Sequence, residues 1–556
     1  MSDQPLLGVH NLSLRLRNTR AGGRIVDAVS FEMSRGEIVG IVGESGSGKT
    51  MLARSIIGLQ PDAIVVDDGD ITLKGRSVGA MNPRELRQIR GAEVSMVFQE
   101  PMTSLNPSMK IGRQLDEPLR VHTDLQPAER VQRCLEIMRQ VGISDPETGL
   151  DAYPHQFSGG MRQRIMLASA MLLQPSLLIA DEPTTALDAI IQRQVLELMI
   201  DLTQSQGTAL LMISHDLPMV ARYCQRILVM RQGQVVESGL TADILARPQH
   251  DYTRALLQSM PGRGPKREFS PEAEPLVTVK NLEVEYTSKS NPFRPRTTKK
   301  ALKGVSVAIR PGEVLAVVGA SGSGKTTLGR TIAGLTEKTA GEVLFRGKSI
   351  EKSQSTYADY RLNCQMVFQD PFGSLNPRMK VGQLVAEALR HDKSLSTKDR
   401  PARVVEILAE VGLDEKFLDR FPHELSGGQR QRIAIARAIV PRPEFVVADE
   451  AVSALDVTVR AQVLDLLADL QKRYNFSCLF ISHDLAVVEK LADRVVVMKD
   501  GEIVEQGRRD DVFDNPKTDY TRALLSAIPM LERTETGVNM RWRFEQPATA
   551  RPESQP

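Results

Sequence analysis

The sequence predicts an α/β fold that is present in two tandem copies. The pattern Gly-x-x-x-x-Gly-Lys-Thr occupies residues 43–50 and again residues 319–326, each time after an apolar run and before a segment with helical spacing. A strand, a glycine-rich loop and a helix in that order are typical of a parallel sheet covered by helices. The chain has 556 residues, too many for one ordinary core, so at least two domains are expected.

The two halves are colinear copies of each other. Lys49 and Lys325 are 276 positions apart (325 − 49), and Ser158 and Ser426 are 268 apart (426 − 158). A nearly constant offset across several landmarks indicates an internal repeat, whose small length differences fall in loops.

Proline, glycine and charge indicate the domain boundaries. We expect a first domain over 1–260, a linker over 261–275 and a second domain over 276–531, because Pro and Gly interrupt regular structure between the halves. The polar, proline-bearing tail over 532–556 is predicted to be disordered. It contains the only tryptophan, Trp542, whose role the sequence does not identify.

Each copy is expected to combine the parallel sheet with an antiparallel β subdomain and an α-helical subdomain. Antiparallel strands are predicted early in both halves, over 12–16, 26–33 and 277–286. Helical spacing follows each glycine-rich loop, over 127–141, 161–173, 397–411 and 429–439. The second half also carries a polar, basic stretch within 287–300, for which a solvated loop is favoured over contact with nucleotide or lipid headgroups.

Composition predicts a chain without a membrane span of its own. Hydrophobic residues make up 41%, and 71 Lys and Arg against 69 Asp and Glu leave a net charge of +2, which gives no global reason to expect a nucleic acid partner. No run of about 18 apolar residues occurs, and residues 1–11 lack the layout of a secretory signal. We therefore expect a cytosolic protein that does any membrane work through partners.

Four cysteines are predicted to be reduced and to lie in or near the cores. They are far apart and show none of the short spacings of metal sites, and disulfides are rare in the cytosol. They are Cys134, Cys224, Cys364 and Cys478.

The glycine-rich loops are predicted to bind phosphate. Small residues let consecutive backbone N–H groups close around phosphate oxygens, while the following helix directs its positive end at the same anion. The lysine would reach the terminal phosphates and the threonine a magnesium ion. A chance glycine-rich turn is a poor alternative, because the pattern occurs twice in the same context. The loop residues are Gly43, Glu44, Ser45, Gly46, Ser47, Gly48, Lys49 and Thr50, and Gly319, Ala320, Ser321, Gly322, Ser323, Gly324, Lys325 and Thr326.

An apolar run followed by two acidic residues also occurs in both halves. The pairs are Asp181 with Glu182 and Asp449 with Glu450. Burying two carboxylates costs free energy unless a positive group lies opposite, and beside a phosphate loop that group is Mg²⁺. Asp181 and Asp449 would hold the ion, and Glu182 and Glu450 would orient and polarise the attacking water.

Two more polar positions recur at the ends of apolar runs. His215 and His483 occur at the same offset in both halves, which favours contact with a γ-phosphate over an ordinary structural hydrogen bond. Gln99 and Gln369 can coordinate Mg²⁺ or water through a side-chain carbonyl. We expect all four residues to take part in catalysis, with both glutamines near the metal.

Ser-Gly-Gly before a helix is a second anion-binding element in each half. Glycine permits close backbone approach and the helix N-terminus supplies positive potential, although alone the serine would be an ordinary helix cap. Two phosphate-binding elements per half suggest that one nucleotide is gripped by elements from both halves. The residues are Ser158, Gly159 and Gly160, and Ser426, Gly427 and Gly428.

These residues together resemble those of the ATP-binding cassette (ABC) ATPases, over nearly all of both halves. The glycine-rich loops match Walker A, the acidic pairs Walker B, Gln99 and Gln369 the glutamine loops, and the Ser-Gly-Gly elements the signatures. Ala-Leu-Asp at 186–188 and 454–456 matches the D-loop, and the two histidines match the switch histidine. The resemblance implies two tandem P-loop NTPase domains, paired head to tail, with two ATP molecules and Mg²⁺ held between them.

Within this family the chain is similar to the tandem ATPase subunits of bacterial dipeptide, oligopeptide and nickel importers. The similarity lies in 99–107 and 369–377 and in the late segments 250–257 and 519–525. It implies a peripheral ATPase at the cytoplasmic face of the inner membrane that binds two transmembrane permeases, fed by an extracytoplasmic solute-binding protein. No nucleic acid partner is expected. No iron–sulfur cluster is expected either, because no cysteine follows the late segment of either half.

Three departures from the family pattern bear on the sites. The first signature has Phe157 and Met161 where the family usually has Leu and Gln, and Ala451 replaces the usual proline after the second catalytic glutamate. Tyr286 is the residue expected to stack on adenine, and Leu16 stands at the equivalent position of the first half. Both glutamates and both histidines are present, so two hydrolytic sites are expected.

Two other functions remain open from the sequence. A soluble tandem-cassette ATPase acting on ribosomes or nucleic acid is disfavoured by the short, proline-rich linker and the near-neutral charge. An exporter is disfavoured by the importer-like segments and by the lack of fused membrane helices. The substrate is not encoded in this chain, so peptides, opine-like conjugates, glutathione and nickel complexes all remain open.

Overall fold

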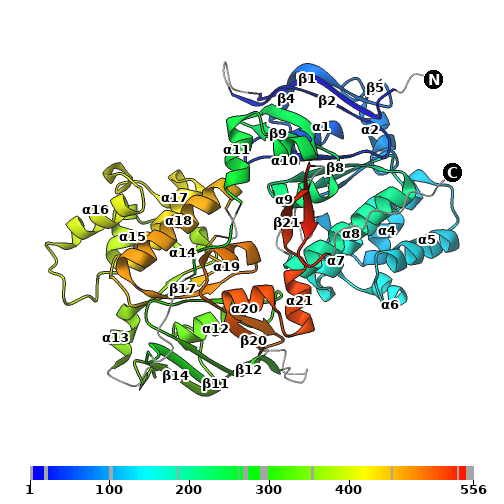
Figure 1. Ribbon diagram of the computed structural model, residues 1–556. Coiled ribbons are helices and arrows are strands. Elements are labelled where there is room, and N and C mark those ends of the chain that lie inside the picture. Colours follow the sequence, from blue (N-terminus) through cyan, green and yellow to red (C-terminus); the bar gives the residue numbers. More distant parts are fainter. Residues whose placement is uncertain are drawn as a thin grey trace. The chain divides into compact units, whose positions relative to one another are not determined.

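Two sheets and a set of helices recur in each half of the computed structural model (Figure 1). The chain divides into a first unit, Met1–Gln258 with Pro529–Pro556, and a second unit, Ser259–Ile528. The structure describes residues 4–17, 23–98, 104–184, 187–260, 262–266, 273–287, 298–351, 356–452, 455–534 and 537–545.

The first unit begins with an antiparallel sheet, as predicted. Its strand order is β2-β1-β4-β5. Leu7 of β1 pairs with Met33 of β2 on one side and with Leu73 of β4 on the other, and all three side chains are buried in the core beneath the sheet. The bounds are β1 Leu7–Leu16, β2 Arg24–Met33, β4 Ile64–Leu73 and β5 Arg76–Ser77.

A six-stranded sheet forms the centre of the first unit, in the order β10-β9-β3-β8-β7-β6. All neighbouring strands are parallel except β10, which runs antiparallel to β9 at one edge. Every residue of β3 and β7 is buried, as expected where both faces of a parallel sheet are covered. The bounds are β3 Ile38–Val42, β6 Val94–Val97, β7 Leu177–Asp181, β8 Ala209–Ser214, β9 Arg226–Arg231 and β10 Gln234–Leu240.

The helices of the first unit include both helical segments predicted there. The segment predicted over 127–141 is α5, which has proline in its first turn and a capping box between Gln126 and Glu129. The segment predicted over 161–173 is α7. The bounds are α1 Lys49–Ile56, α2 Pro83–Ile89, α4 Ile111–His122, α5 Pro127–Gln140, α6 Pro146–Asp151, α7 Gly159–Met171, α8 Ala189–Gln206, α9 Leu217–Tyr223, α10 Thr241–Ala246 and α11 Asp251–Gln258.

The second unit repeats this plan. Its antiparallel sheet has the order β12-β11-β14-β15 and its central sheet the order β16-β17-β18-β13-β19-β20. The strands are β11 Val277–Thr287, β12 Thr298–Ile309, β13 Val314–Val318, β14 Ala340–Phe345, β15 Lys348–Ser349, β16 Cys364–Val367, β17 Phe445–Asp449, β18 Ser477–Ile481, β19 Arg494–Lys499 and β20 Glu502–Arg508. The helices are α12 Lys325–Ile332, α13 Thr356–Asn363, α14 Pro371–Ser374, α15 Val381–Glu387, α16 Arg400–Glu410, α17 Gly427–Ile439, α18 Val457–Tyr474, α19 Leu485–Leu491, α20 Arg509–Asp514 and α21 Asp519–Leu525.

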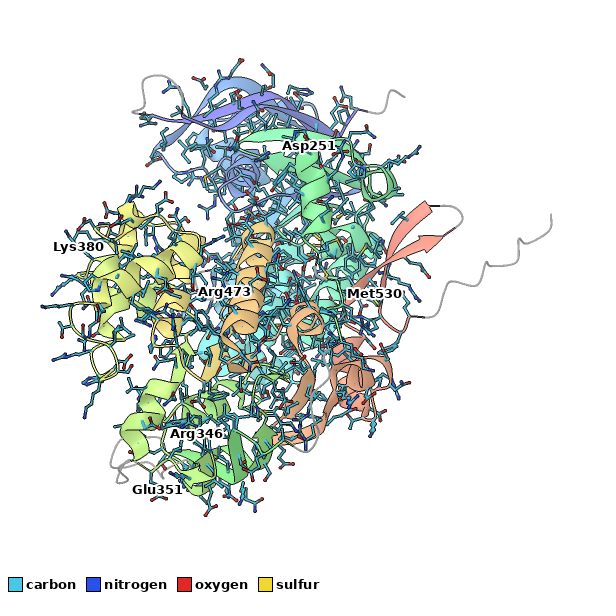
Figure 2. The ribbon with its side chains drawn as sticks, turned by 60° about the vertical axis from the view of Figure 1, so that its left-hand side comes forward. Asp251, Arg346, Glu351, Lys380, Arg473 and Met530 are labelled. Carbon is cyan, nitrogen blue, oxygen red and sulfur yellow. The ribbon has the colours of Figure 1, made fainter. Side chains whose placement is uncertain are left out.

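The predicted disorder of the tail is wrong for residues 532–534 and 537–545. Strands β21 (Pro529–Thr534) and β22 (Gly537–Trp542) form a hairpin that belongs to the first unit (Figures 1 and 2). Trp542 is 1% exposed. It lies edge-on to Tyr223, with ring centroids 6.1 Å apart, and under the guanidinium of Arg193, 4.9 Å from the ring centre. Local composition did not reveal this structure, because the hairpin folds against residues about 300 positions earlier in the chain.

Residues 262–266 have no regular secondary structure, and they are not simply solvated. Arg263 forms ion pairs with Glu489 and Asp514, both at 2.8 Å. The N–H of Gly264 donates to the carbonyl of Glu489 at 3.1 Å. These contacts attach the linker to α19 and α20 of the second unit.

Two further expectations concern cysteines and the membrane. All four cysteines are free thiols and buried, as predicted, and burial raises the pKa of the Cys134 thiol to about 11. Among the helices of the described ranges, none is both long enough and apolar enough to cross a bilayer.

Candidate functional site

The carboxyl ends of three parallel strands meet at one edge of the first unit's central sheet. Val42 of β3 lies opposite Ser214 of β8, and Ile213 of β8 lies opposite Asp181 of β7. Residues that follow these strands therefore emerge side by side, which is where open α/β sheets bind ligands. The phosphate loop, the acidic pair and the switch histidine all occupy this edge.

The first phosphate loop leads from β3 into α1. Gly48 has φ +98°, a value that favours glycine, and a Cβ on Gly43 would lie 2.2 Å from the carbonyl oxygen of Met230. Lys49 is 4% exposed, and its Nζ donates to the carbonyls of Gly43 and Glu44, both at 2.7 Å. The lysine side chain therefore lies against the phosphate loop from which it is expected to reach the phosphates.

Thr50 and Asp181 form a hydroxyl and carboxylate pair beside this loop. Thr50 Oγ1 donates to Asp181 Oδ1 at 3.1 Å. Burial raises the pKa of Asp181 to about 6, with a further contribution from the negative charge of Glu182 that the hydrogen bond from Thr50 partly offsets. A buried carboxylate beside a half-buried hydroxyl provides two hard oxygen ligands, which suit a magnesium ion.

Glu182 adopts an unusual backbone conformation. Its φ is +47°, which is strained for a residue with a side chain and is typical of functional sites. Its N–H donates to the carbonyl of Ile213 at 2.9 Å, which holds the turn. One carboxylate oxygen lies 3.1 Å from Nδ1 of His215, so the predicted water-polarising glutamate and the predicted switch histidine meet.

The second unit repeats the lysine and threonine contacts almost without change. Lys325 Nζ donates to the carbonyls of Gly319 and Ala320, both at 2.8 Å. Thr326 Oγ1 donates to Asp449 Oδ1 at 3.1 Å. Burial raises the pKa of Asp449 as well.

Glu450 is the centre of a hydrogen-bonded group in the second unit. Its φ is also +47°. Gln369 Nε2 donates to one carboxylate oxygen at 2.7 Å, and His483 Nδ1 lies 3.3 Å from the other. Burial acts to raise the pKa of Glu450 and to lower that of His483, but their mutual hydrogen bond and charges outweigh it, so the pKa of Glu450 lies below and that of His483 above its ordinary value. The glutamine thus contacts the glutamate itself.

The second unit also retains unsatisfied polar atoms where a ligand would bind. Among the described residues, Asp449 Oδ2 and Ser323 Oγ are buried without a hydrogen-bond partner. Such atoms are costly unless a ligand satisfies them. The acceptor beside the Thr326 hydroxyl fits a cation with oxygen ligands, and the serine lies within the phosphate loop.

The two signature serines cap long helices. Ser158 Oγ accepts the N–H of Met161 at 3.3 Å at the start of α7. Ser426 Oγ accepts the N–H of Gln429 at 3.3 Å at the start of α17, and the side chain of Gln429 accepts the N–H of Ser426 at 3.0 Å. Methionine has no amide to complete this capping box, so the departure at Met161 costs the first signature one hydrogen bond.

The second glycine of each signature has a packing role that sequence reasoning missed. A Cβ on Gly160 would lie 2.5 Å from Cγ2 of Ile191, and a Cβ on Gly428 would lie 2.4 Å from Cγ1 of Val459. These neighbours belong to α8 and α18, which follow the D-loops. Glycine thus allows each signature helix to lie close to the next helix of its own unit.

The remaining predicted residues vary in how far the structure describes them. Gln99, Ala186 and Ala454 lie outside the described residues. Tyr286 lies near the end of β11 with 48% of its surface exposed, and its hydroxyl lies 3.5 Å from Thr327 Oγ1 at the start of α12. An exposed ring beside the phosphate-loop helix is accessible for stacking.

Sequence reasoning also missed one contact with each phosphate loop. The hydroxyl of Tyr252 accepts the N–H of Glu44 at 3.0 Å, and the hydroxyl of Tyr520 accepts the N–H of Ala320 at 2.9 Å. The repeated sequence Asp-Tyr-Thr-Arg-Ala-Leu-Leu was the signal that could have revealed it.

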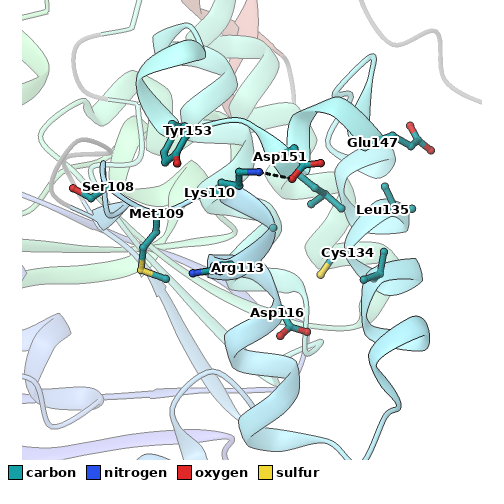
Figure 3. A pocket seen from close by; sticks show the side chains of 13 residues that line it. Ser108, Met109, Lys110, Arg113, Asp116, Cys134, Leu135, Glu147, Asp151 and Tyr153 are labelled. Carbon is teal, nitrogen blue, oxygen red and sulfur yellow. Dashed lines mark hydrogen bonds and ion pairs between the residues drawn. The ribbon is translucent and has the colours of Figure 1, made fainter.

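A pocket of about 650 Å³ lies in the helical part of the first unit, among α4, α5 and α6 (Figure 3). Its lining begins directly after the 99–107 segment, with Ser108, Met109 and Lys110. Lys110 pairs with Asp151 at 2.8 Å on one side, and Val131, which also lines the pocket, is 52% exposed. The lining mixes charged and apolar side chains.

Comparison with known proteins agrees with this geometry. A family described as "ABC transporter" matches residues 26–185 and 302–453, and one described as "Oligopeptide/dipeptide transporter, C-terminal region" matches 236–301 and 504–553. The chain is 47% identical over 538 residues to the peptidoglycan transport ATP-binding protein YejF of Agrobacterium fabrum, covering 96% of this chain and 98% of that protein. It is 42% identical over 561 residues to the glutathione import ATP-binding protein GsiA of Escherichia coli, covering 95% and 90% respectively.

Proposed function

Because the chain belongs to the ABC transporter family of ATP-binding proteins, we propose that its two units are the paired ATPase domains of a bacterial importer for peptides and peptide-like solutes. The duplicated catalytic set carries this proposal: each unit has a loop lysine, a Thr–Asp pair and a glutamate joined to a histidine. The match to the oligopeptide/dipeptide transporter C-terminal region, in both halves, supports the importer class.

In each unit different side chains have different roles in ATP hydrolysis. The loop lysines, Lys49 and Lys325, neutralise charge on the terminal phosphates once they leave the loop carbonyls. Thr50 with Asp181, and Thr326 with Asp449, are the residues that would hold Mg²⁺, which supplies charge neutralisation on the phosphate oxygens.

The glutamates orient and polarise the attacking water. The φ of +47° and the hydrogen bond from each glutamate's N–H to the neighbouring strand fix the carboxylate at the sheet edge. The switch histidine beside it stabilises the carboxylate, and we expect it to contact the γ-phosphate. In the second unit Gln369 adds a direct link from the glutamine loop to Glu450, so displacement of that loop would move the carboxylate.

We expect the two signatures to bind phosphate groups of ATP in addition to the phosphate loops. They are Ser158, Gly159 and Gly160 in the first unit, and Ser426, Gly427 and Gly428 in the second. The helix caps at Ser158 and Ser426 support this role, because each lies at the start of a 13-residue helix whose first backbone N–H groups and positive end suit an anion. ATP binding would close the units together, and hydrolysis would let them separate.

The importer as a whole comprises this chain, two transmembrane permeases and an extracytoplasmic solute-binding protein. The chain would then lie at the cytoplasmic face of the membrane as a peripheral subunit. The pocket among α4, α5 and α6 is the docking site that we assign to a cytoplasmic segment of one permease. Its position after the 99–107 segment and the exposed apolar surface of Val131 support this assignment.

The transported solutes contain peptide bonds. The two relatives are named for peptidoglycan and glutathione transport, and both of those solutes contain peptide linkages. Because the selecting residues lie on the permeases and the binding protein, the exact solute depends on those partners.

A pull-down of the tagged chain from solubilised membranes tests the proposal. Recovery of two multi-span permeases is the expected result, and recovery of ribosomal subunits instead would overturn it. Val131→Glu, in the pocket, should reduce permease recovery, whereas Val66→Glu, at a similarly exposed position on β4, is the matched control and should not. Equal recovery with both variants would contradict the docking site alone.

A further inference from the structure

The late segments that mark the resemblance to peptide importers reach the phosphate loops. Asp-Tyr-Thr-Arg-Ala-Leu-Leu forms α11, which begins at Asp251 (Figure 2), and α21, which begins at Asp519. The tyrosine hydroxyl of each helix accepts the N–H of the second residue of its phosphate loop, at 3.0 Å from Tyr252 and at 2.9 Å from Tyr520. The same contact is therefore built twice.

The tyrosine and the loop lysine hold opposite edges of a single peptide group. The Glu44 N–H points to Tyr252, and the Gly43 carbonyl of the same peptide accepts Lys49 Nζ at 2.7 Å. In the second unit the corresponding carbonyl, that of Gly319, accepts the lysine at 2.8 Å. Because a peptide group is planar, fixing its N–H fixes the direction of its carbonyl and so the resting place of the lysine.

A positively charged side chain packs over the ring of each tyrosine. Tyr252 is 4% exposed, and the guanidinium of Arg231 lies 5.0 Å from its ring centre. In the second unit the ammonium of Lys499 lies 5.2 Å from the ring centre of Tyr520. Arg231 and Lys499 are the last residues of β9 and β19, strands that neighbour the phosphate-loop strand. The hydroxyl is thus fixed in place relative to the sheet.

A carboxylate also anchors the start of each helix. Glu237 of β10 accepts the N–H of Gln249 at 2.8 Å and of His250 at 3.0 Å. Glu505 of β20 accepts the N–H of Lys517 at 2.9 Å and that of the next residue at 3.2 Å. A helix held at its first turn carries its tyrosine to the loop in a fixed direction.

We propose that Tyr252 and Tyr520 are positioning residues of the two ATP sites. Each keeps the first peptide group of the loop from rotating, so that the carbonyl stays turned toward the lysine and away from the phosphates. The contact that the two units share uses the backbone N–H of the loop, which is available from Glu44 in one unit and from Ala320 in the other. This role rests on the proposed ATPase function and concerns nucleotide binding, not the solute that is transported.

The test removes only the two hydroxyl groups. The Tyr252→Phe/Tyr520→Phe double variant of the full chain, purified without permeases, is assayed for ATP hydrolysis and for binding of a fluorescent ATP analogue. Loss of the hydrogen bond from the loop N–H at each site should raise the KM for ATP and the Kd about five-fold, with kcat within about two-fold of the parent. Values of KM and Kd within two-fold of the parent would overturn the proposal.

A matched control separates positioning from general stability. Tyr357→Phe likewise removes one tyrosine hydroxyl that bonds to the backbone. This hydroxyl donates to the carbonyl of Gly334 at 3.1 Å, and its loss should leave KM and Kd unchanged. An equal rise in the control would contradict a specific role. If the double variant does not fold, the single variants decide: each should fold and raise the Kd of one site, and failure of both to fold would assign a structural role and overturn the proposal. Permease recovery does not enter this test, so its outcome is independent of the import proposal.

Discussion

Replacing Trp542 with alanine should destabilise the first unit, although the residue follows the whole second unit in the chain. The indole is 1% exposed and packs against Tyr223 and Arg193. Truncating a buried aromatic side chain to alanine typically costs about 3–5 kcal/mol. Since each kcal/mol shifts the melting temperature of a 150–250-residue domain by about 2–4 °C, the first unit should melt about 6–20 °C lower.

Calorimetry of the full chain, together with hydrogen exchange, measures this effect. The transition of the first unit should fall and the amides of α9 and α10 should exchange faster, because β22 packs on both helices. Phe544→Ala is the control, since that neighbouring ring is 45% exposed and its loss should change little. A lowered transition in the second unit alone, or unchanged exchange in α9, would refute the reasoning.

Three other predictions concern the sites. Glu182→Gln and Glu450→Gln should each lower the rate of ATP hydrolysis, and the double variant should lose at least about 100-fold; a single variant with the parent's rate would contradict two active sites. Because burial raises the pKa of Asp181 to about 6 from 3.8, ionisation of the metal-free site costs stability as the pH rises through that range. Mg²⁺ should therefore raise the melting temperature more at pH 8 than at pH 5, and an equal rise would oppose the assignment. Gly428→Ala should destabilise the second unit by about 1–3 kcal/mol in chemical denaturation, whereas Gly427→Ala, whose Cβ would meet only a carbon 3.9 Å away, should not.

The catalytic set could be predicted from sequence because its members follow strands. The loop that carries Lys49 begins directly after β3, Asp181 ends β7 and His215 directly follows β8. Parallel strands bring such positions to one edge of the sheet. The repeat supplied a second, independent copy of each motif. The sequence predicts Gln369 near the metal but does not predict its contact with Glu450. In the structure the Gln369 amide donates to the Glu450 carboxylate.

The contacts that sequence reasoning missed are those made across long separations. Tyr252 meets Glu44 208 positions earlier in the chain, and Arg222 pairs with Glu545 across 323 positions. Local composition gives no sign of such partners, and by itself it predicts a disordered tail. For Gly160 the sequence pattern predicts only a phosphate contact, because its packing against Ile191 depends on how two helices approach each other.

The hairpin that completes the first unit also determines when, during synthesis, that unit can complete its packing. The ribosome needs roughly 15–60 s to add the residues between Gln258 and Trp542 at about 5–20 residues per second. During that interval α9 and α10 lack the contacts that β22 makes with them. The first unit therefore cannot complete its packing until the hairpin has been synthesised, after the whole of the second unit.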